Sequence, residues 1–436
     1  MSKENKKLSR RKFIVGAASA LALVAVGTGM SFLPRTGMVR SLKNRAHELL
    51  ANDQVQYLRQ IVTKDNAHSR TIMWQATQAM EQPVVVLRQR NKDQEQVIPA
   101  QQDFFQDDGT MNNQYSVLVD SLEAGQEYEY AVGDGQAVGK WHKLHTPATN
   151  EKNYSLLIFP DSQSADYSAW SNMAHLAYEK NPDVTMFVNM GDLVDNGEDS
   201  SQWHAWFHGG ENLLEELAFA PVLGNHEYYD KNWKVRLPEA YLHYFQLPDN
   251  GSTNFQRYYY SYDYGDVHYV VLNTTEEETR DFRQGLMEEQ LAWLEKDMAA
   301  NTKKWKVVLM HRDVLQYRIH NRPERKEGFS TEGEIFMPLF EKYNIDVVFT
   351  AHLHTYRNRG HIYQQEAANK GPVYILTGVA GDVRYPGLWI DHALDQHTAP
   401  QPEVDNYLKM KVAPNQLEVS CYLHTGEEID KIVINK

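Results

Sequence analysis

The chain has 436 residues, of which 42% are apolar and 23% charged, an ordinary balance for a folded protein with room for two or three domains. Its formal net charge of −14 argues against a nucleic-acid-binding protein, which usually presents a basic face. The single cysteine, Cys421, excludes an intrachain disulfide and a zinc–thiolate site, and its apolar neighbours indicate a small buried core residue.

The first 35 residues are typical of a targeting segment. Basic residues between Lys3 and Lys12 precede an uncharged stretch from Phe13 to Pro34. Residues 9–14, Ser-Arg-Arg-Lys-Phe-Ile, resemble the twin-arginine export signal, whose route carries folded proteins; an ordinary secretory signal with a chance arginine pair is the alternative. The stretch is long for a signal peptide and close to spanning length, so cleavage and retention as a membrane anchor both stay open. We expect an extracellular, cell-surface or membrane-anchored protein.

Residues 36–66 are polar with a helical pattern, as in 41–50, and we expect a helical spacer there. Residues 67–148 change character. Short β-branched and aromatic runs alternate with polar turns such as Asp107-Asp108-Gly109, which favours a small all-β sandwich. The run from Leu122 to Gly133 resembles the region of the penultimate strand in a fibronectin type III domain. That resemblance implies that Tyr128 is the buried corner tyrosine of such a sandwich.

Residues 152–395 alternate strand-like runs with helical patterns at 168–178, 202–217 and 287–300, which predicts a layered α/β domain. The runs 258–264 and 267–272 form a hairpin through Gly265-Asp266, so not every strand is parallel. The strands of residues 405–436, two of them joined through Pro414-Asn415, are expected to close a sheet of the same domain, which then spans 152–436.

Five apolar runs in this domain each lead directly into side chains that can bind a metal. Short β-branched runs bounded by turn residues indicate buried strands, and open α/β sheets bind their ligands at the carboxyl ends of strands. We therefore expect one cluster at one sheet edge. The candidate donors are the oxygens of Asp161, Asp192, Glu227 and Asn225 and the imidazoles of His226, His311, His352 and His354.

A mixed set of imidazole, carboxylate and amide donors without thiolate suits Zn, Mn, Fe or Ni. One carboxylate between two ions can bridge them, and two ions about 3.5–4 Å apart form the clamp used for phosphoryl transfer. Each motif is weak alone, because Gly-Asp after a strand is commonly a turn and a lone His-x-His is commonly structural. Their fixed order after successive strands makes the combination specific.

In that order the chain resembles the calcineurin-like metallophosphoesterases, and among them the purple acid phosphatase branch. The matching motifs are Asp161-Ser162-Gln163, Gly191-Asp192-Leu193-Val194-Asp195, Gly224-Asn225-His226-Glu227, His311, and Ala351-His352-Leu353-His354. The resemblance implies a four-layer α/β/β/α sandwich preceded by a fibronectin type III-like domain.

The resemblance also implies roles. Asp161 and His354 hold a first metal ion, Asp192 bridges both ions, and the second ion is held by Asn225, His311 and His352. His226 is then a catalytic residue that contacts the phosphate, Glu227 orients it, and a hydroxide held by the metals attacks phosphorus in line.

Three residues depart from the family pattern. Gln163 stands where many relatives have histidine, and either ligates the first metal or only donates a hydrogen bond. Asp195 stands where purple enzymes have the tyrosine that binds iron(III) and gives the colour, so we expect no purple colour from that source. Ala351 replaces a glycine and leaves the ligands intact.

Substrate contacts are expected from loop residues beside the ligands, since arginine recognises phosphate oxygens bidentately. Tyr356 and Arg357, directly after His354, are the favoured pair, and Arg312 is a third candidate. His204, His208, His243, His268 and His361 lie outside the motifs, and we interpret them as packing or surface residues.

The sequence thus predicts an exported binuclear hydrolase of small phosphate mono- or diesters that holds two divalent or trivalent ions, Fe, Mn or Zn. Association with a membrane or cell wall through the N-terminus is a further partner interaction left open, and so is the oligomeric state. The alternative is a non-catalytic cell-surface protein that binds through its fibronectin-like module.

Overall fold

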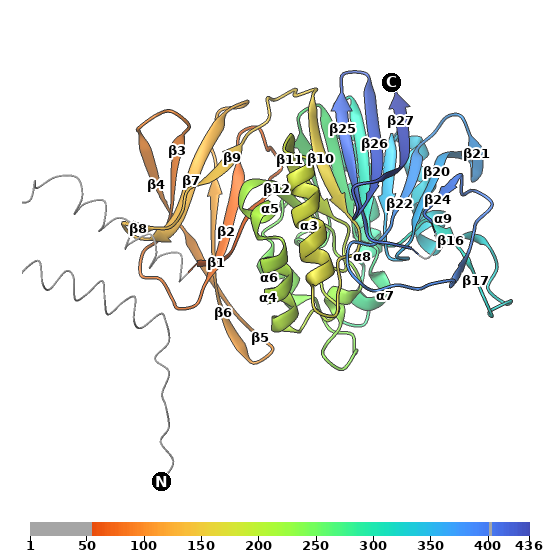
Figure 1. Ribbon diagram of the computed structural model, residues 1–436, viewed down its shortest axis with the longest axis horizontal. Helices are drawn as coiled ribbons and strands as arrows, with labels where there is room; N and C mark the ends of the chain where they lie inside the picture. Colours follow the sequence, from red (N-terminus) through yellow and green to blue (C-terminus); the bar gives the residue numbers. More distant parts are fainter. Residues whose placement is uncertain (1–54, 401–402) are drawn as a thin grey trace, which may run out of the picture. The chain divides into compact units, whose positions relative to one another are not determined.

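The computed structural model describes residues 55–400 and 403–436 (Figure 1). The predicted export segment 1–35 and the first part of the predicted spacer, up to residue 54, lie outside the described residues. Within the described ranges, no helix combines the length and the apolar character needed to cross a membrane.

An all-β sandwich of two sheets forms the N-terminal part of the described chain. One sheet contains β1 (Val55–Ile61), β2 (Arg70–Ala76), β6 (Thr110–Val119) and β5 (Gln101–Asp107). The other contains β4 (Glu95–Pro99), β3 (Pro83–Gln89), β7 (Glu127–Asp134), β8 (Ala137–Val138) and β9 (His142–His145). Fully buried Trp74, Tyr115 and Tyr130 lie in the apolar core between them.

Tyr128 is buried, and its hydroxyl oxygen accepts a hydrogen bond from the backbone N–H of Glu123 at 2.8 Å. This is the contact that a corner tyrosine makes with the chain a few residues upstream. The expected role of Tyr128 is confirmed by this geometry.

The helical prediction for the spacer is wrong over Val55–Ile61, which forms β1 between β12 on one side and β2 on the other. Two of its polar residues are buried. Arg59 is fully buried, donates to the carbonyl of Tyr244 at 2.7 Å, and has its guanidinium 5.2 Å from the centre of the Phe207 ring. Gln60 is buried as well and donates to the carbonyl of Glu215 at 2.8 Å. Partners far away in the sequence therefore decide the conformation of this segment.

The first sheet of the α/β part continues directly from the sandwich. β10 (Tyr154–Phe159), β11 (Val184–Asn189) and β12 (Ala218–Pro221) are parallel, and β12 pairs with β1. On the other side of β10, antiparallel β25 (Asn406–Ala413), β26 (Gln416–Leu423) and β27 (Glu428–Asn435) complete a ten-stranded sheet. The C-terminal strands close this sheet as expected.

The second sheet contains the predicted hairpin of β13 (Tyr260–Tyr264) and β14 (Val267–Leu272). It continues through β15 (Trp305–Met310), β19 (Val347–Thr350), β22 (Val373–Thr377), β20 (Tyr356–Tyr363) and β21 (Glu366–Ala368), with β24 (His397–Thr398) beside β20. Two short ribbons pair β16 (Leu315–Gln316) with β18 (Gly328–Phe329) and β17 (Arg318–Ile319) with β23 (Trp389–Ile390).

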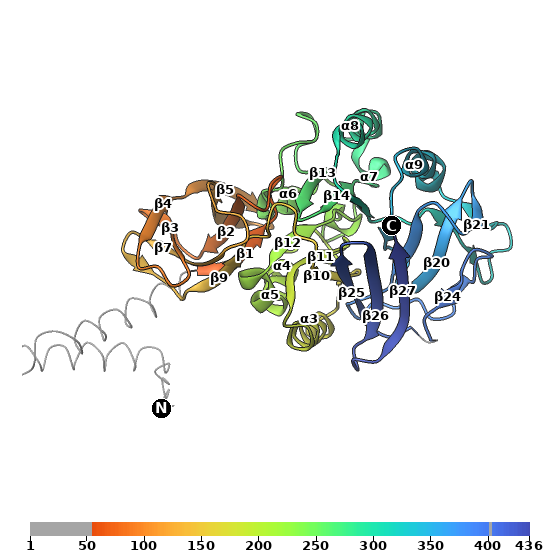
Figure 2. The same ribbon diagram turned by 90° about the horizontal axis from the view of Figure 1, so that it is seen from above.

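Helices cover the outer faces of the two sheets, which gives the expected α/β/β/α layering (Figure 2). The first sheet carries α3 (Ser168–Lys180), α4 (Ser200–Gly209) and α5 (Glu211–Glu216), and the second carries α7 (Glu276–Thr279), α8 (Leu286–Ala300) and α9 (Thr331–Lys342). A short α6 (Glu239–Tyr244) and a 3-10 turn (His226–Tyr228) lie in the connections. The single helix predicted over 202–217 is two helices that meet at Gly209-Gly210.

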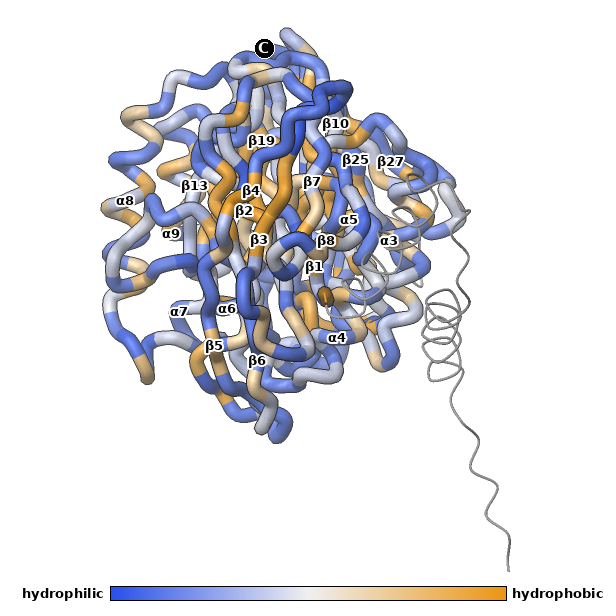
Figure 3. The backbone as a smooth tube through the Cα atoms, turned by 90° about the vertical axis from the view of Figure 1, so that its left-hand side faces the viewer, coloured by the Kyte–Doolittle hydropathy of each residue, from blue (hydrophilic) through white to orange (hydrophobic). Residues whose placement is uncertain are grey.

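The central strands are apolar on both faces because both faces are covered. In β15, Val308 and Met310 pack in one apolar core with Phe336 of α9, whereas Val307 and Leu309 pack in the core shared with the first sheet. Figure 3 shows the same pattern, with orange apolar stretches in strands such as β3 and β19 and blue in many of the connecting loops. These unbroken apolar runs are what made the strands visible in the sequence.

Candidate metal centre

The ligand candidates follow the carboxyl ends of five strands. Asp161 follows β10, Asp192 follows β11, Asn225 follows β12, His311 follows β15, and the pair His352 and His354 follows β19. Because β10, β11 and β12 are parallel, and β15 and β19 are parallel, these ends gather at one edge of each sheet. The predicted single cluster is present, but its side chains come from the edges of two sheets and not of one.

Two groups of side chains place their donor atoms close enough to hold metal ions. Asp192, His311 and His352 form one group, and Asp161, Asp192 and His354 form the other, with the donor atoms of each group within 4.8 Å of one another. Asp192 belongs to both groups. Its Oδ2 lies 3.1 Å from Nε2 of His311, and Oδ2 of Asp161 lies 3.2 Å from Nε2 of His354. This arrangement is suited to two ions that share Asp192.

Three of the oxygen atoms that could bind the ions are buried and accept no hydrogen bond from the protein. Oδ2 of Asp161, Oδ2 of Asp192 and Oε1 of Gln163 have no hydrogen-bond donor, although their residues are almost completely buried. Burying an ionised carboxylate oxygen without a partner is costly, so such groups normally coordinate metals or are paired. These residues therefore fit a metal centre on physical grounds.

The imidazoles are oriented for ligation through Nε2. The Nδ1 of His311 faces the carbonyl of Met190 at 2.9 Å, and the Nδ1 of His354 faces the carbonyl of Val383 at 2.9 Å. A carbonyl can only accept, so Nδ1 carries the proton and Nε2 keeps a lone pair toward the cluster.

Backbone strain is concentrated at the same residues. Asp192, His352 and His354 have φ angles of 49°, 75° and 51°, a left-handed region that non-glycine residues seldom adopt. Residues held in such conformations cost about 1–3 kcal/mol each and persist where the surroundings fix them, typically at functional sites.

Gly224 is required for space. A Cβ at this position would lie 2.2 Å from Oδ1 of Asp192, and the φ of Gly224 is not in the left-handed region. The loops after β11 and β12 can approach each other only because this side chain is absent.

Glu227 has a different role from the predicted one, because its carboxylate does not bond to the His226 ring. It accepts hydrogen bonds from the backbone N–H groups of Asp192 at 3.1 Å, Leu193 at 2.7 Å and Gly224 at 2.8 Å. Burial, followed by the nearby charge of Asp192, raises the pKa of Glu227 to about 7. Glu227 therefore fixes the backbone that carries Asp192.

His226 is oriented by Asp195, which the sequence pattern marked only as a missing tyrosine. The Nδ1 of His226 donates to the carbonyl of Asp195 at 2.8 Å and lies 3.3 Å from its carboxylate. The Nε2 atom points toward the cluster, 3.9 Å from Oδ2 of Asp192. Burial alone would lower the pKa of His226, but the charges of Asp192 and Asp195 outweigh it and raise the pKa to about 9. His226 can therefore carry a proton at the edge of the metal centre.

Asn225 and Gln163 complete the cluster. Oδ1 of Asn225 lies 3.2 Å from Nε2 of His311, on the side of the second ligand group. Gln163 is fully buried, and its amide nitrogen lies 3.5 Å from Nε2 of His354. Its unpartnered Oε1 belongs to the same amide, so Gln163 has a donor within reach of the first group.

The prediction that Tyr356 and Arg357 contact substrate does not hold. The Tyr356 hydroxyl donates to Asp430 at 2.8 Å, and Arg357 is buried with its guanidinium close to Asp391 and Asp395. The reason is that β20 begins at Tyr356 and carries the chain away from the cluster. Arg312 does lie beside the site, but its guanidinium is paired with Glu278 at 2.5 Å.

Three aromatic side chains that the sequence motifs do not assign to the site lie against its histidines. The ring centres of Tyr229 and Trp233 are 5.2 and 5.8 Å from that of His226, and the ring centre of Tyr385 is 4.9 Å from that of His354. Burial and then the charges of Asp161, Asp192 and Asp195 raise the pKa of Tyr385, so its phenol lies near the cluster. Trp233 and Tyr385 are exposed, and the sequence does not reveal exposure.

Two family models of known proteins match parts of the chain. Residues 144–356 match the family model for calcineurin-like phosphoesterases, and residues 55–147 match the model for the N-terminal domain of purple acid phosphatases.

Curated relatives are similar at low identity. Purple acid phosphatase 15 of Arabidopsis thaliana is 26% identical over 319 residues, which cover 66% of this chain and 57% of the relative. Acid phosphatase type 7 of Mus musculus is 25% identical over 307 residues, covering 64% and 67%. The Fe(3+)-Zn(2+) purple acid phosphatase 12 of Arabidopsis thaliana is 22% identical over 332 residues, covering 70% and 66%. The chain thus spans between about half and two thirds of the length of these relatives.

Two solved structures share the fold. Purple acid phosphatase PPD1 from seeds of yellow lupin (Lupinus luteus) superposes with a TM-score of 0.74 at 18% identity, covering 88% of this chain and 75% of the lupin chain. The structure of PhoD superposes with a TM-score of 0.61 at 13% identity, covering 86% and 91%. At these identities the likeness concerns the fold alone.

Proposed function

We propose that this chain, which combines a purple acid phosphatase N-terminal domain with a calcineurin-like phosphoesterase domain, is a binuclear metal-dependent phosphohydrolase of small phosphate esters. One observation carries the proposal. The two adjoining ligand groups share Asp192 and contain buried carboxylate oxygens without a partner. A non-catalytic surface protein would have no need to keep such costly groups.

We assign Asp161, His354 and Gln163 to one ion, Asn225, His311 and His352 to the other, and Asp192 to both. Ions of this kind make a water nucleophile available near neutral pH and neutralise charge on the phosphoryl group. Iron, zinc and manganese all suit this donor set. With Asp195 in place of a tyrosine, a solution of the iron-loaded protein should lack the charge-transfer colour of purple enzymes.

The residues of the chain supply positioning and proton transfer. His226, held by Asp195, faces the cluster through Nε2 and is placed to donate a proton to the leaving oxygen of the ester. Glu227 holds the turn of Asp192, and Arg312 remains the candidate phosphate contact from the rim. The same proposal includes export through the N-terminal segment. It takes both phosphate monoesters and phosphate diesters as candidate substrates.

The test measures metal content and hydrolysis together. Purified protein should hold about two ions per chain after loading with Fe, Zn or Mn, and should cleave p-nitrophenyl phosphate or bis(p-nitrophenyl) phosphate. Less than one ion per chain, or no hydrolysis of either ester by loaded protein, would overturn the proposal. Gln163→Ala tests one ligand separately, since unchanged metal content in that variant removes Gln163 from the set.

A further inference from the structure

Exposed aromatic rings stand directly beside the metal centre. Trp233 is 55% exposed and Tyr385 is 38% exposed, although both lie within ring-contact distance of a histidine of the cluster. Tyr229 contacts both His226 and Trp233, with its ring centre 5.2 and 5.9 Å from theirs. Single exposed apolar side chains are normal, but two exposed aromatic rings against the histidines of one site indicate a surface that can bind a flat group.

The loop that carries Trp233 is held in place. The carboxylate of Asp230 accepts hydrogen bonds from the backbone N–H groups of Asn232 at 2.7 Å and Lys234 at 2.8 Å, and Tyr229 bridges to Val235. Trp233 itself has a left-handed φ of 62°, which this tight turn imposes. The turn therefore presents the indole in a fixed position beside His226.

The N-terminal sandwich supports the same loop from outside. Arg236 donates to both carboxylate oxygens of Asp107 at 2.8 and 3.1 Å, and Lys231 donates to Asp108 at 2.7 Å. Asp107 ends β5, and Asp108 lies in the turn that leads to β6. A rigid aromatic surface binds a ring with less loss of conformational entropy than a mobile one.

The charges around the site argue against a polyanionic substrate. Arg312 is paired with Glu278 and also lies 3.6 Å from Glu277, and Arg384 is paired with Asp405. These arginines add little net positive charge for a second phosphate group. The metal centre and His226 are suited to one phosphoryl group, and the surface next to them is aromatic.

We propose that Trp233, Tyr229 and Tyr385 form a binding surface for the alcohol part of the ester, so that the substrate is a singly phosphorylated compound with a planar, uncharged aromatic group. This inference rests on the proposed function, because the phosphoryl group must lie at the metal centre for the ring to reach these side chains. Offset or edge-to-face contact between rings contributes about two- to tenfold in binding beyond simple burial.

The test uses metal-loaded protein and pairs of ligands that differ only in the ring. Phenethyl phosphate and n-propyl phosphate have leaving groups of similar reactivity, and phenylphosphonate and methylphosphonate are analogues that cannot be hydrolysed. We expect Trp233→Ala to weaken the binding of both ring-bearing ligands by about five- to tenfold, seen in KM for phenethyl phosphate and in Kd for phenylphosphonate. The values for n-propyl phosphate and methylphosphonate should change less than about twofold, and Trp233→Phe should restore most of the affinity for the ring.

Phe282→Ala is the matched control, since Phe282 is 50% exposed and lies outside the three-ring surface. It should leave all four constants unchanged. The inference is overturned if Trp233→Ala weakens both members of a pair equally, or if wild-type protein binds the two phosphonates with equal affinity. If loaded protein hydrolyses no ester but still binds phenylphosphonate more tightly through Trp233, the proposed function fails and the aromatic surface stands.

Discussion

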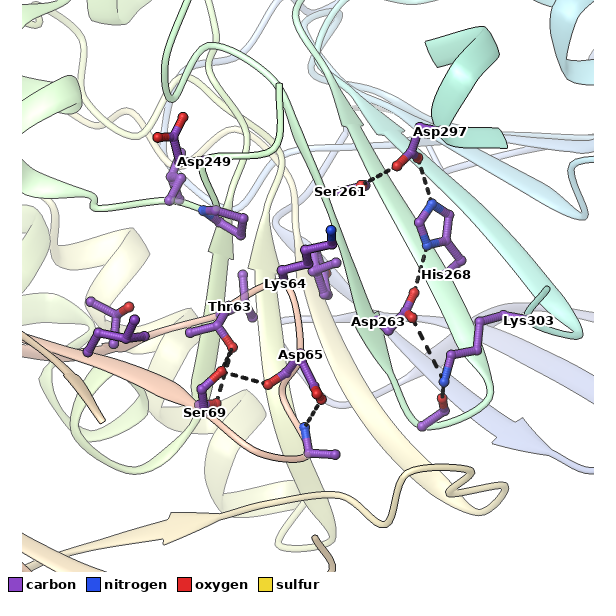
Figure 4. A pocket seen from close by; sticks show the side chains of 18 of the residues that line it. Thr63, Lys64, Asp65, Ser69, Asp249, Ser261, Asp263, His268, Asp297 and Lys303 are labelled. Atoms are coloured by element: carbon purple, nitrogen blue, oxygen red, sulfur yellow. Dashed lines mark hydrogen bonds and ion pairs between the residues drawn. The ribbon is translucent and has the colours of Figure 1, made fainter. Parts of the chain in front are cut away.

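Two clusters of histidine and carboxylate lie in the α/β part of this molecule, and they differ in what their polar atoms contact. At the metal centre, Asp161 and Asp192 each keep a buried oxygen without a partner. In the second cluster, Nδ1 of His268 contacts Asp263 at 2.7 Å and Nε2 contacts Asp297 at 2.8 Å, while Ser261 donates to Asp297 at 2.9 Å. Figure 4 shows this second cluster in the wall of a cavity of about 550 Å³ beside the loop after β1.

The difference teaches how a ligand site is distinguished from a structural ion pair. Both clusters use the same residue types, and both histidines His226 and His268 have a pKa raised to about 9 against the effect of burial. In the His268 cluster each ring nitrogen already contacts a carboxylate oxygen, so the cluster needs no cation. The metal centre is incomplete without a cation, because its carboxylate oxygens converge without donors between them.

The largest expected effect comes from the shared ligand. Asp192→Asn keeps the side-chain shape but removes the charge common to both ligand groups, so we expect loss of at least one ion per chain. A bound ion contributes several kcal/mol to transition-state stabilisation, so kcat/KM should fall by about a thousandfold or more. Metal analysis and kinetics measure both, and a variant that keeps two ions and normal turnover would remove Asp192 from the centre.

Removing His226 should have a smaller effect and leave the ions in place. His226→Ala is expected to lower kcat by about a hundredfold, as for a positioned general acid. Asp195→Asn should lower kcat by about tenfold, since it loosens the ring without removing it. His268→Ala serves as the control and should leave kcat unchanged. Loss of metal from His226→Ala would contradict its placement outside the ligand set.

The pH dependence of stability tests the His268 cluster next. The folded pKa of His268, about 9, lies above the unfolded value of about 6.5, so its stabilisation is complete below pH 6.5 and is lost as pH rises through 9. We therefore expect the free energy of unfolding to fall by about 2 kcal/mol between pH 7 and pH 9, because His268 loses its proton. Denaturant unfolding of wild type and His268→Gln at both values isolates the contribution, and equal pH dependence of the two proteins would refute it.

The smallest effect concerns one carboxylate of the His268 cluster. Asp297→Asn should lower the free energy of unfolding by about 1–2 kcal/mol, less than for a fully buried pair because the Asp297 side chain is 18% exposed. Metal content and turnover should stay normal. The matched control is Asp103→Asn, which breaks a 2.7 Å pair with the more exposed His243, and should cost less than about 1 kcal/mol. Equal losses in the two variants would show that burial does not set the strength of the pair.

Sequence patterns predicted the central strands and the ligands because both signals are local. An apolar run of β-branched residues indicates a buried strand wherever it pairs, and a donor residue at its end lies at the sheet edge. The same reasoning failed at β1, where buried Arg59 and Gln60 depend on partners in other elements. It also failed at Tyr356 and Arg357, because adjacency to His354 in sequence does not determine where the next strand carries its side chains.

Assignments beyond the ligands needed three-dimensional information. The carboxylate of Glu227 bonds to three backbone N–H groups, two of them on a loop more than thirty residues earlier in the sequence, and no sequence pattern reveals such contacts. Asp195 was visible only as a departure from a family motif, and its contact with His226 arises from the meeting of two loops. Trp233 and Tyr385 belong to loops whose exposure depends on the whole fold.

The position of β1 inside the ten-stranded sheet has a consequence for how the chain acquires its structure. β1 begins the described chain, yet its parallel neighbour β12 is made much later, after the whole sandwich and two further strands. During synthesis the sandwich therefore emerges with one of its strands lacking a neighbour, and the sheet can be completed only when residues 218–221 are available. Such distant pairing slows folding and leaves an open strand edge that can pair with another chain. The rate at which this protein reaches its native state should accordingly depend on closing the β1–β12 contact more than on forming the metal centre.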